Sequence, residues 1–320
     1  MRKFLNFGLS VYVLVAIVCI ILINYFFTTY SRNFQVLSPL PDFLTYFKNS
    51  QVATINLWLP EFISKQIGNE PYITAKSALA YDLTSNKIIY SKNPKEKLPM
   101  ASLTKIMTAI ISLENPKKDD KYIVSQKDLV GEDVMGLSSG ENLTLNELLY
   151  GLILTSGNDS AETLASNFDG GRPVFIKAMN DKAKALGLSD TNFTNPTGLE
   201  GDGFQHTTAY DLLIITKYAL SKFPAFNDVI STFDYNIYQT ANHKAYYLEN
   251  QTNLLTSYPG VKGVKTGYTP EAGLCLVTYL DYNGHKIVSI LLNSDNRRGE
   301  MKELLDYSLK SQGIKPPPHI

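Results

Sequence analysis

The strand-like segments of this chain fall into two groups, separated by a long helical block. Residues 75–83 and 86–92 form the first group and are joined by a turn at 84–86. Residues 275–293 predict a hairpin, with Asn283-Gly284 as its two-residue turn. This order predicts an α+β fold. An antiparallel β-sheet is built from both ends of one domain, flanked by helices, with an inserted helical cluster.

The helical block is read from apolar residues that repeat at helical spacing. A capping box, in which Thr144 and Glu147 satisfy each other's backbone donors, marks one helix start. A further strand is expected at 243–249. The helices are expected at 103–114, 147–156, 159–167, 172–186, 208–222 and 297–310.

The N-terminus predicts a membrane anchor. Arg2 and Lys3 precede an apolar run over residues 7–27, which matches the roughly 20 residues that cross a bilayer as a helix. Basic residues before the run favour an inside-to-outside orientation. A cleaved signal peptide would have a shorter apolar region and a small-x-small site. We therefore expect one uncleaved transmembrane helix that contacts the lipid bilayer through residues 7–27.

The remaining chain divides by composition. Residues 1–30 are expected to hold the cytoplasmic start and the anchor, and residues 31–72, broken by four prolines, read as a spacer or stalk. One folded domain should occupy 73–315, with a short tail at 316–320.

Composition and spacing argue against several function classes. Thirty basic residues balance thirty acidic residues, so no net field favours nucleic-acid binding. The four histidines are scattered without ligand spacing, and no metal site is expected. No glycine-rich nucleotide loop follows a strand, so no cofactor is expected either.

Ser102-Leu-Thr-Lys105 lies at the start of a predicted helix. Positions i and i+3 share a helix face, so the hydroxyl and the amine come within reach of each other. Serine is a weak nucleophile until a base takes its proton, and lysine is that base only if burial or another cation depresses its pKa. The flanking residues are apolar, which suits burial of Lys105. A helix N-terminus would also stabilise an oxyanion at Ser102.

Two further triplets have less specific patterns. Ser156-Gly157-Asn158 lies between two predicted helices, although most S-x-N triplets merely cap turns. Lys265-Thr266-Gly267 lies in a strand-like segment where a glycine lets a ligand approach the backbone. Taken alone, this triplet favours an ordinary edge strand with a solvated lysine.

The combination is more specific than its parts. S-x-x-K, S-D-N and K-T-G are the signature of penicillin-binding proteins and class A β-lactamases. The chain carries the three motifs in this order, with S-G-N as a variant of the second. Over about residues 73–312 the chain resembles the low-molecular-mass penicillin-binding proteins, the D-alanyl-D-alanine carboxypeptidases. LILTSGNDSAETLA, TNFTNPTGL and GVKTGYTPEAGLCLV are among the resembling blocks.

The resemblance implies a serine β-lactamase/DD-peptidase-like fold and a serine peptidase that works through an acyl-enzyme. Ser102 would attack the carbonyl between two D-Ala residues, with Lys105 as the general base. Ser156 would complete the proton path, and Asn158 would hold the substrate backbone. Lys265 would also supply the cation that depresses the pKa of Lys105.

The resemblance also implies the substrate contacts and partners. Lys265, Thr266 and Gly267 would bind the terminal carboxylate, assisted by Arg297, which fits the spacing to the last helix better than Arg298. The backbone N–H groups of Ser102 and Tyr268 would form the oxyanion hole. Expected partners are peptidoglycan stem peptides ending in D-Ala-D-Ala and β-lactam inhibitors, bound on the extracytoplasmic side of a bacterial membrane.

Three alternatives remain open, of which the first two use the same fold and the third is a different class of protein. A β-lactamase would need a glutamate to activate the deacylating water, and Glu162, Glu200 and Glu249 lack the expected context. A DD-endopeptidase acting on cross-links would share the acylation step. A non-catalytic, membrane-tethered sensor would bind penicillin or peptidoglycan without turnover.

Overall fold

The computed structural model describes residues 61–62, 70–252 and 254–319. The predicted transmembrane helix at 7–27 and most of the predicted spacer lie outside these residues. Within the described part of the chain, no helix combines the length and apolar character needed to cross a membrane.

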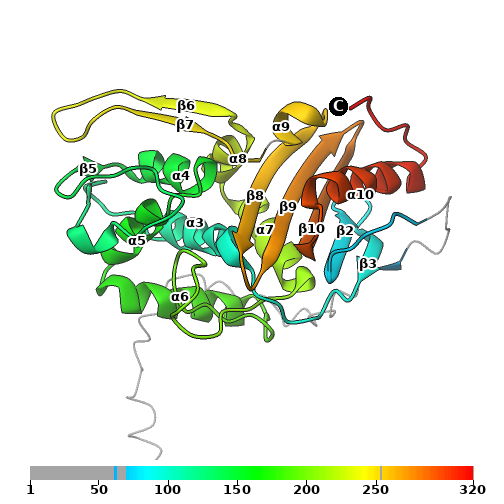
Figure 1. The fold of residues 1–320 in the computed structure, drawn as a ribbon, viewed down its shortest axis with the longest axis horizontal. Coiled ribbons are helices and arrows are strands. Elements are labelled where there is room, and N and C mark those ends of the chain that lie inside the picture. The colour runs from blue at the N-terminus through cyan, green and yellow to red at the C-terminus, as the bar shows by residue number, and fades with distance from the viewer. Residues whose placement is uncertain (1–60, 63–69, 253, 320) are drawn as a thin grey trace, which may run out of the picture. The chain divides into compact units, whose positions relative to one another are not determined.

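A six-stranded sheet forms the centre of the fold (Figure 1). Its order is β1-β3-β2-β10-β9-β8. Strand β10 pairs antiparallel with β2, for example Ser289 with Ala80, so the two ends of the domain meet in one sheet as predicted. The strands are β1 (Glu61–Phe62), β2 (Ser77–Asp82), β3 (Lys87–Lys92), β8 (Val261–Thr269), β9 (Gly273–Tyr282) and β10 (His285–Ser294).

Strand β1 extends the sheet beyond the expected start of the folded domain. Glu61 pairs in parallel with Lys87 of β3, although residues 61–62 fall inside the segment expected to be a spacer. Two residues are too few to show a strand pattern, because alternation needs at least four positions. This part of 31–72 therefore belongs to the sheet.

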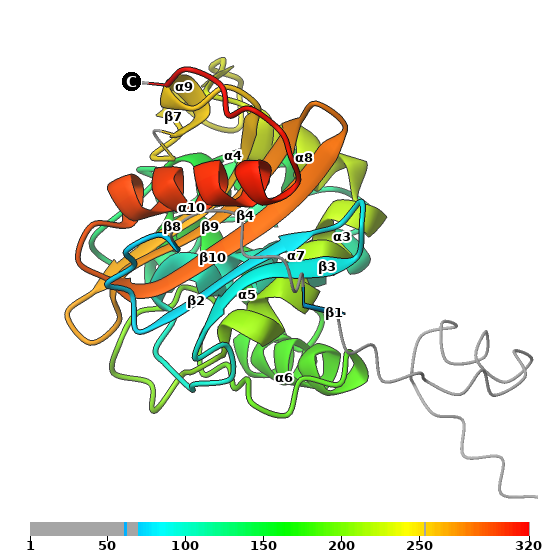
Figure 2. The same ribbon diagram turned by 90° about the vertical axis from the view of Figure 1, so that its right-hand side faces the viewer.

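Helices cover both faces of the sheet, as Figure 2 shows. Helix α10 (Arg297–Ser311) packs Met301, Leu304 and Leu305 into the core on one face. Helices α7 (Ala209–Lys222) and α8 (Pro224–Ser231) contact the opposite face. Because both faces are covered, the central strands are buried along most of their length.

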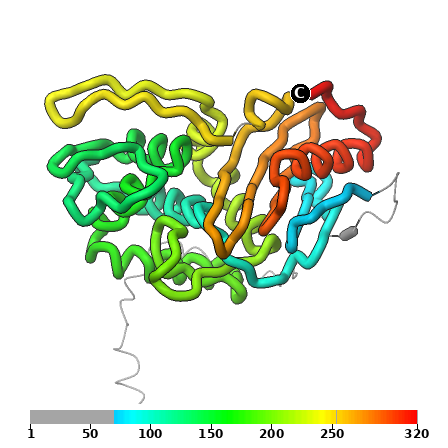
Figure 3. Tube along the Cα trace, in the orientation of Figure 1, coloured from blue at the N-terminus to red at the C-terminus, as the bar shows by residue number. Residues whose placement is uncertain are grey.

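The inserted helical cluster lies beside the β8 edge (Figures 1 and 3). It contains α3 (Lys105–Glu114), α4 (Leu145–Leu154), α5 (Asn158–Ser166) and α6 (Gly171–Ala185). The Thr144–Glu147 capping box is confirmed, although α4 begins and ends about two residues earlier than expected. The hairpin of β6 (Asp234–Ile237) and β7 (Tyr246–Glu249) runs along this cluster.

Several short elements were not predicted. They are β4 (Tyr122–Ile123), β5 (Asn142–Leu143), β6, α8, α9 (Leu254–Ser257) and the 3₁₀ turn at Gln126–Asp128. The strand expected at 243–249 is confined to β7. The described part of the predicted tail, residues 316–319, contacts the domain: the His319 ring stacks on Tyr258 at 4.7 Å, and its Nε2 lies 3.0 Å from Asp306 Oδ1.

Candidate active site

The candidate nucleophile lies in a tight turn at the edge of the helical cluster. Ser102 is in a 3₁₀ turn (η1, Ala101–Thr104), and Lys105 is the first residue of α3. Ala101 has a positive φ of 47°, and Thr104 Oγ1 donates to its carbonyl at 2.8 Å. The predicted helix start is present, with a 3₁₀ turn in place of its first α-helical turn.

The Lys105 amine is fully buried and has three oxygen neighbours. Its Nζ lies 2.8 Å from Ser102 Oγ, 2.7 Å from Asn158 Oδ1 and 2.8 Å from the Thr197 carbonyl. The amide and carbonyl oxygens can only accept hydrogen bonds. A neutral amine has two N–H groups, and these two acceptors use both. The remaining lone pair then faces the Ser102 hydroxyl, ready to accept its proton.

Two effects hold the pKa of Lys105 well below its usual value. Burial is the larger, and the positive charge of Lys265 acts in the same direction. The carboxylates of Asp133, Asp159 and Glu162 oppose them. The amine is therefore held toward its neutral form, which a general base requires.

Lys265 lies in β8, which is indeed an edge strand, but its side chain is only 1% exposed. Its Nζ donates to the Thr266 carbonyl at 3.0 Å. Burial lowers its pKa to about 7; Asp133 opposes this shift and the charge of Arg297 adds to it. A buried cation whose partner in the described part of the chain is a neutral carbonyl favours an incoming anion. This lysine is therefore not the solvated residue of an ordinary edge strand.

The second motif spans the loop between α4 and α5 and ends at Asn158, the first residue of α5. Ser156 has a positive φ of 59° and is buried, and its Oγ has no hydrogen-bond partner among the described residues. Gln251 stabilises this loop, because its Nε2 donates to the Thr155 carbonyl at 3.1 Å. An unpaired buried hydroxyl is costly, which favours a substrate or water partner for Ser156.

These motifs meet at one cavity of about 370 Å³. Three further wall residues, Asp133, Gln251 and Leu274, were not singled out from the sequence. Lys105, Asn158 and Lys265 lie buried and are not among the wall residues. The predicted site residues on the wall are Ser102, Ser156, Thr266, Gly267, Tyr268 and Arg297.

Arg297 reaches the cavity from the first turn of α10. Its Nη1 donates to the Gly267 carbonyl at 2.7 Å, which fixes the guanidinium beside β8. Arg298, the alternative, is exposed and is not among the residues that line the cavity. The structure therefore places Arg297, and not Arg298, where a ligand carboxylate could be bound.

Close packing of β8 on η1 places the Tyr268 backbone near Ser102. A Cβ atom on Gly267 would lie 3.2 Å from the Ser102 backbone nitrogen. Tyr268 is the next residue; it pairs with Leu274 of β9, and its side chain is 61% exposed. This geometry is compatible with an oxyanion hole formed by the two backbone N–H groups, as expected from the sequence.

Sequence reasoning missed two groups near the nucleophile. Thr197 contributes only its backbone carbonyl, which no side-chain pattern reveals. Asp133 lies in the loop before α4, and its carbonyl accepts from Asn158 N at 2.8 Å. No motif marks Asp133, because only the fold brings it near the basic side chains of Lys105, Lys265 and Arg297.

The fold and the site together define a class of protein, the serine hydrolases, and a buried lysine contacts the serine where a histidine usually does. Comparison with known proteins narrows this class. Residues 64–296 match the family described as D-alanyl-D-alanine carboxypeptidase, Peptidase_S11, and the chain belongs to this family.

The similarity to individual relatives agrees with this family assignment. The chain is 34% identical over 269 residues to the D-alanyl-D-alanine carboxypeptidase DacF of Bacillus subtilis, covering 80% of this chain and 68% of that protein. The crystal structure of the Streptomyces K15 DD-transpeptidase superposes with a TM-score of 0.71 at 30% identity. This match covers 76% of the present chain and 100% of the other.

Proposed function

We propose that this protein is a serine-type D-Ala-D-Ala carboxypeptidase that trims peptidoglycan stem peptides through an acyl-enzyme on Ser102. Family membership supports the reaction class. One observation carries the assignment of residues: Lys105 Nζ lies 2.8 Å from Ser102 Oγ while two acceptor oxygens occupy its N–H groups.

Acylation begins when Lys105 Nζ takes the hydroxyl proton and Ser102 Oγ bonds to the carbonyl carbon of the penultimate D-Ala. The negative charge on the carbonyl oxygen is stabilised by the Ser102 and Tyr268 backbone N–H groups. The C–N bond then breaks, and the leaving amine receives the proton by way of Ser156. In deacylation, Lys105 takes a proton from water as the water oxygen attacks the ester carbonyl. The C–O bond to Ser102 then breaks, Lys105 returns the proton to Ser102 Oγ, and the shortened peptide leaves as a carboxylic acid.

The terminal carboxylate of the substrate is bound at the other wall. Lys265 supplies a positive charge whose hydrogen-bond partner among the described residues is a neutral carbonyl, and Thr266 supplies a hydroxyl. Arg297 adds a second cation beside Gly267. Charge-assisted hydrogen bonds of this kind favour a carboxylate over a neutral terminus, which is the preference that a carboxypeptidase requires.

Substitution of Arg297 tests this binding role. For Arg297→Ala we expect KM for a D-Ala-D-Ala peptide to rise by about 10-fold or more, because one charge-assisted hydrogen bond to the carboxylate is lost. The matched control is Arg298→Ala, which removes an exposed arginine from the same helix turn and should leave KM close to that of the wild type. Equal effects of the two substitutions would contradict the assignment.

β-Lactams should acylate the same serine. A related structure, penicillin-binding protein D2 of Listeria monocytogenes, was solved in an ampicillin-bound form and superposes with a TM-score of 0.66 at 28% identity. β-Lactamase activity requires a glutamate that activates the deacylating water. It is disfavoured because none of the three candidate glutamates lines the cavity at Ser102. Glu162 pairs with Arg172 at 2.7 Å, and Glu200 accepts from the Glu271 backbone N–H. We therefore expect a long-lived acyl-enzyme.

DD-endopeptidase action is a second candidate function. The D-alanyl-D-alanine endopeptidase of Escherichia coli is 31% identical over 238 residues, which covers 73% of that protein. The acyl donor and the serine are the same in both reactions, and only the leaving amine differs. Parallel assays on a pentapeptide and on a cross-linked dimer separate the two activities.

We further propose that the enzyme is anchored in the cell membrane. The 21-residue apolar run at 7–27 would cross the bilayer once, with residues 31–72 leading to a catalytic domain at 73–315 on the extracytoplasmic side. Residues 61–62 of this spacer and His319 of the tail would accompany the domain, given their contacts.

Release of D-Ala tests the proposed function. Wild-type protein incubated with a pentapeptide ending in D-Ala-D-Ala should release free D-Ala, and Ser102→Ala should lower the rate by several orders of magnitude. If the wild type bound penicillin but released no D-Ala from any stem peptide, the alternative of a non-catalytic sensor would be correct.

A further inference from the structure

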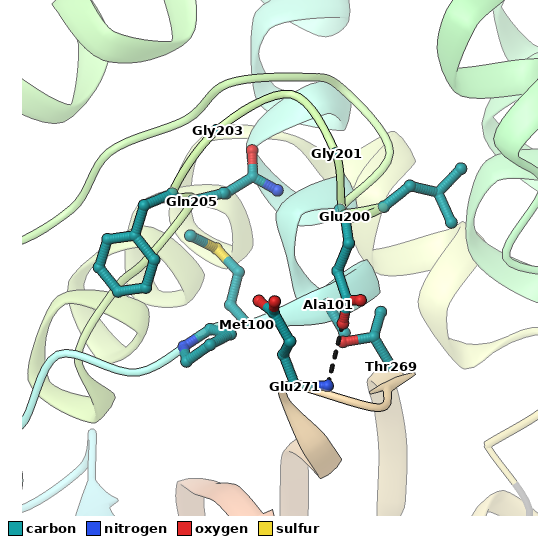
Figure 4. A pocket seen from close by; sticks show the side chains of 12 residues that line it. Met100, Ala101, Glu200, Gly201, Gly203, Gln205, Thr269 and Glu271 are labelled. Atoms are coloured by element: carbon teal, nitrogen blue, oxygen red, sulfur yellow. Dashed lines mark hydrogen bonds between the residues drawn. The ribbon is translucent and has the colours of Figure 1, made fainter.

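A second cavity, of about 280 Å³, lies beside the nucleophile turn (Figure 4). Its wall includes Met100 and Ala101, the two residues that precede Ser102, and Thr269 at the end of β8. Gly198 also lines it and packs against the Ala101 backbone. The cavity is small compared with the roughly 300–1,000 Å³ of sites that hold whole ligands, and it suits a single side chain.

The position of this cavity follows from the direction of β8. Thr266 and Gly267 line the first cavity, whereas Thr269 lines the second. On the proposed function, the leaving D-Ala lies near Lys265 and Arg297, and the scissile carbonyl lies at Ser102. The acyl part of the substrate then continues along β8 toward Thr269. The residue that precedes D-Ala-D-Ala would therefore place its side chain in the second cavity.

The wall of this cavity combines negative charge with apolar surface. The carboxylates of Glu200 and Glu271 extend from opposite sides of it in Figure 4, and Glu200 Oε1 accepts from the Glu271 backbone N–H at 3.0 Å. Met100, Leu199 and Phe204 supply apolar surface. Among the described residues that line the cavity, none is lysine, arginine or histidine.

These features match an aminoalkyl side chain. Its methylene stem would lie on the apolar wall, and its ammonium would lie between the two carboxylates, a division that long cationic side chains commonly adopt. We propose that the second cavity selects stem peptides whose residue before D-Ala-D-Ala carries a free primary ammonium. Glu200 and Glu271 are its specificity-determining residues. This inference rests on the proposed function.

Two tripeptides that differ only in this charge test the proposal. They are Nα-acetyl-L-Lys-D-Ala-D-Ala and its Nα,Nε-diacetyl form. We expect wild-type protein to favour the free amine by about 2- to 5-fold in kcat/KM, the range expected of exposed ion pairs. The preference should weaken as ionic strength rises. In Glu200→Gln/Glu271→Gln the ratio should approach one, whereas Glu303→Gln, an exposed change on α10, should keep the wild-type ratio.

The wild-type ratio requires no substituted protein, so it does not depend on whether the double variant folds. Equal turnover of the two peptides by wild type would overturn this inference alone. A preference that persists in the double variant would also overturn it. If neither peptide released D-Ala, the proposed function itself would be overturned, and the inference with it.

Discussion

Lys105→Ala is expected to lower the rate of Ser102 acylation by at least about 10²–10⁴-fold, the contribution typical of a general base. The substitution removes the only amine in contact with Ser102 Oγ in the described structure. It also leaves Asn158 Oδ1 and the Thr197 carbonyl without their donor. The measurement is the rate of labelling by a fluorescent penicillin. Normal labelling would show that Lys105 is not the base.

The pH dependence of the wild type provides a second readout that does not require a variant. Acylation should fall as the pH is lowered through the depressed pKa of Lys105, because the protonated amine cannot accept the serine proton. Carboxylate binding should weaken as the pH rises above about 7, because Lys265 then loses its charge in the unliganded protein. A Lys105→Ala variant with residual activity should lose the acidic limb and keep the alkaline one.

Gly198→Ala is expected to be the most damaging single-methyl change near the site. A Cβ atom there would lie 2.0 Å from the Ala101 carbonyl oxygen, which is backbone and cannot rotate away. Gly198 also has a positive φ of 92°, which is strained for any other residue. Relief requires a shift of the turn that carries Ser102. We expect a loss of about 2–4 kcal/mol in unfolding free energy, combining overpacking with backbone strain.

Gly140→Ala separates the clash from the strain. Gly140 has a similar φ of 89°, but a Cβ atom there would meet nothing within 4 Å. The Gly140→Ala variant should therefore lose about 1–2 kcal/mol of unfolding free energy, the cost of backbone strain alone, and keep normal penicillin labelling. Denaturant unfolding and labelling rates measure the two effects. If Gly198→Ala and Gly140→Ala behaved alike, contact between Gly198 and Ala101 would not shape the nucleophile turn.

Local signals explain why much of the fold could be predicted. Asn283 and Gly284 both have positive φ, as a two-residue hairpin turn requires, so the dipeptide determined the β9–β10 connection. The Thr144–Glu147 capping box is equally local. Of the short elements, β1, β4 and β5 have only two residues each, and tertiary contacts stabilise them rather than a sequence period.

The candidate site shows the same division. Lys105 and Ser102 are one helical turn apart, so their contact follows from spacing. Asn158 and Thr197 reach the same amine from 53 and 92 residues away, and only the fold brings them there. The sequence predicted that the three motifs converge at one site. It did not predict which acceptors would bind the N–H groups of Lys105. Those acceptors direct the lone pair toward the serine.

The central claim is that Ser102 is a nucleophile activated by a neutral Lys105. The most direct test is the intact mass of the protein after incubation with benzylpenicillin, followed by peptide mapping of the adduct. The account predicts one covalent adduct per chain, mapped to Ser102, stable for minutes or longer and absent from Ser102→Ala. No adduct on the wild type, or an adduct mapped to another residue, would contradict it.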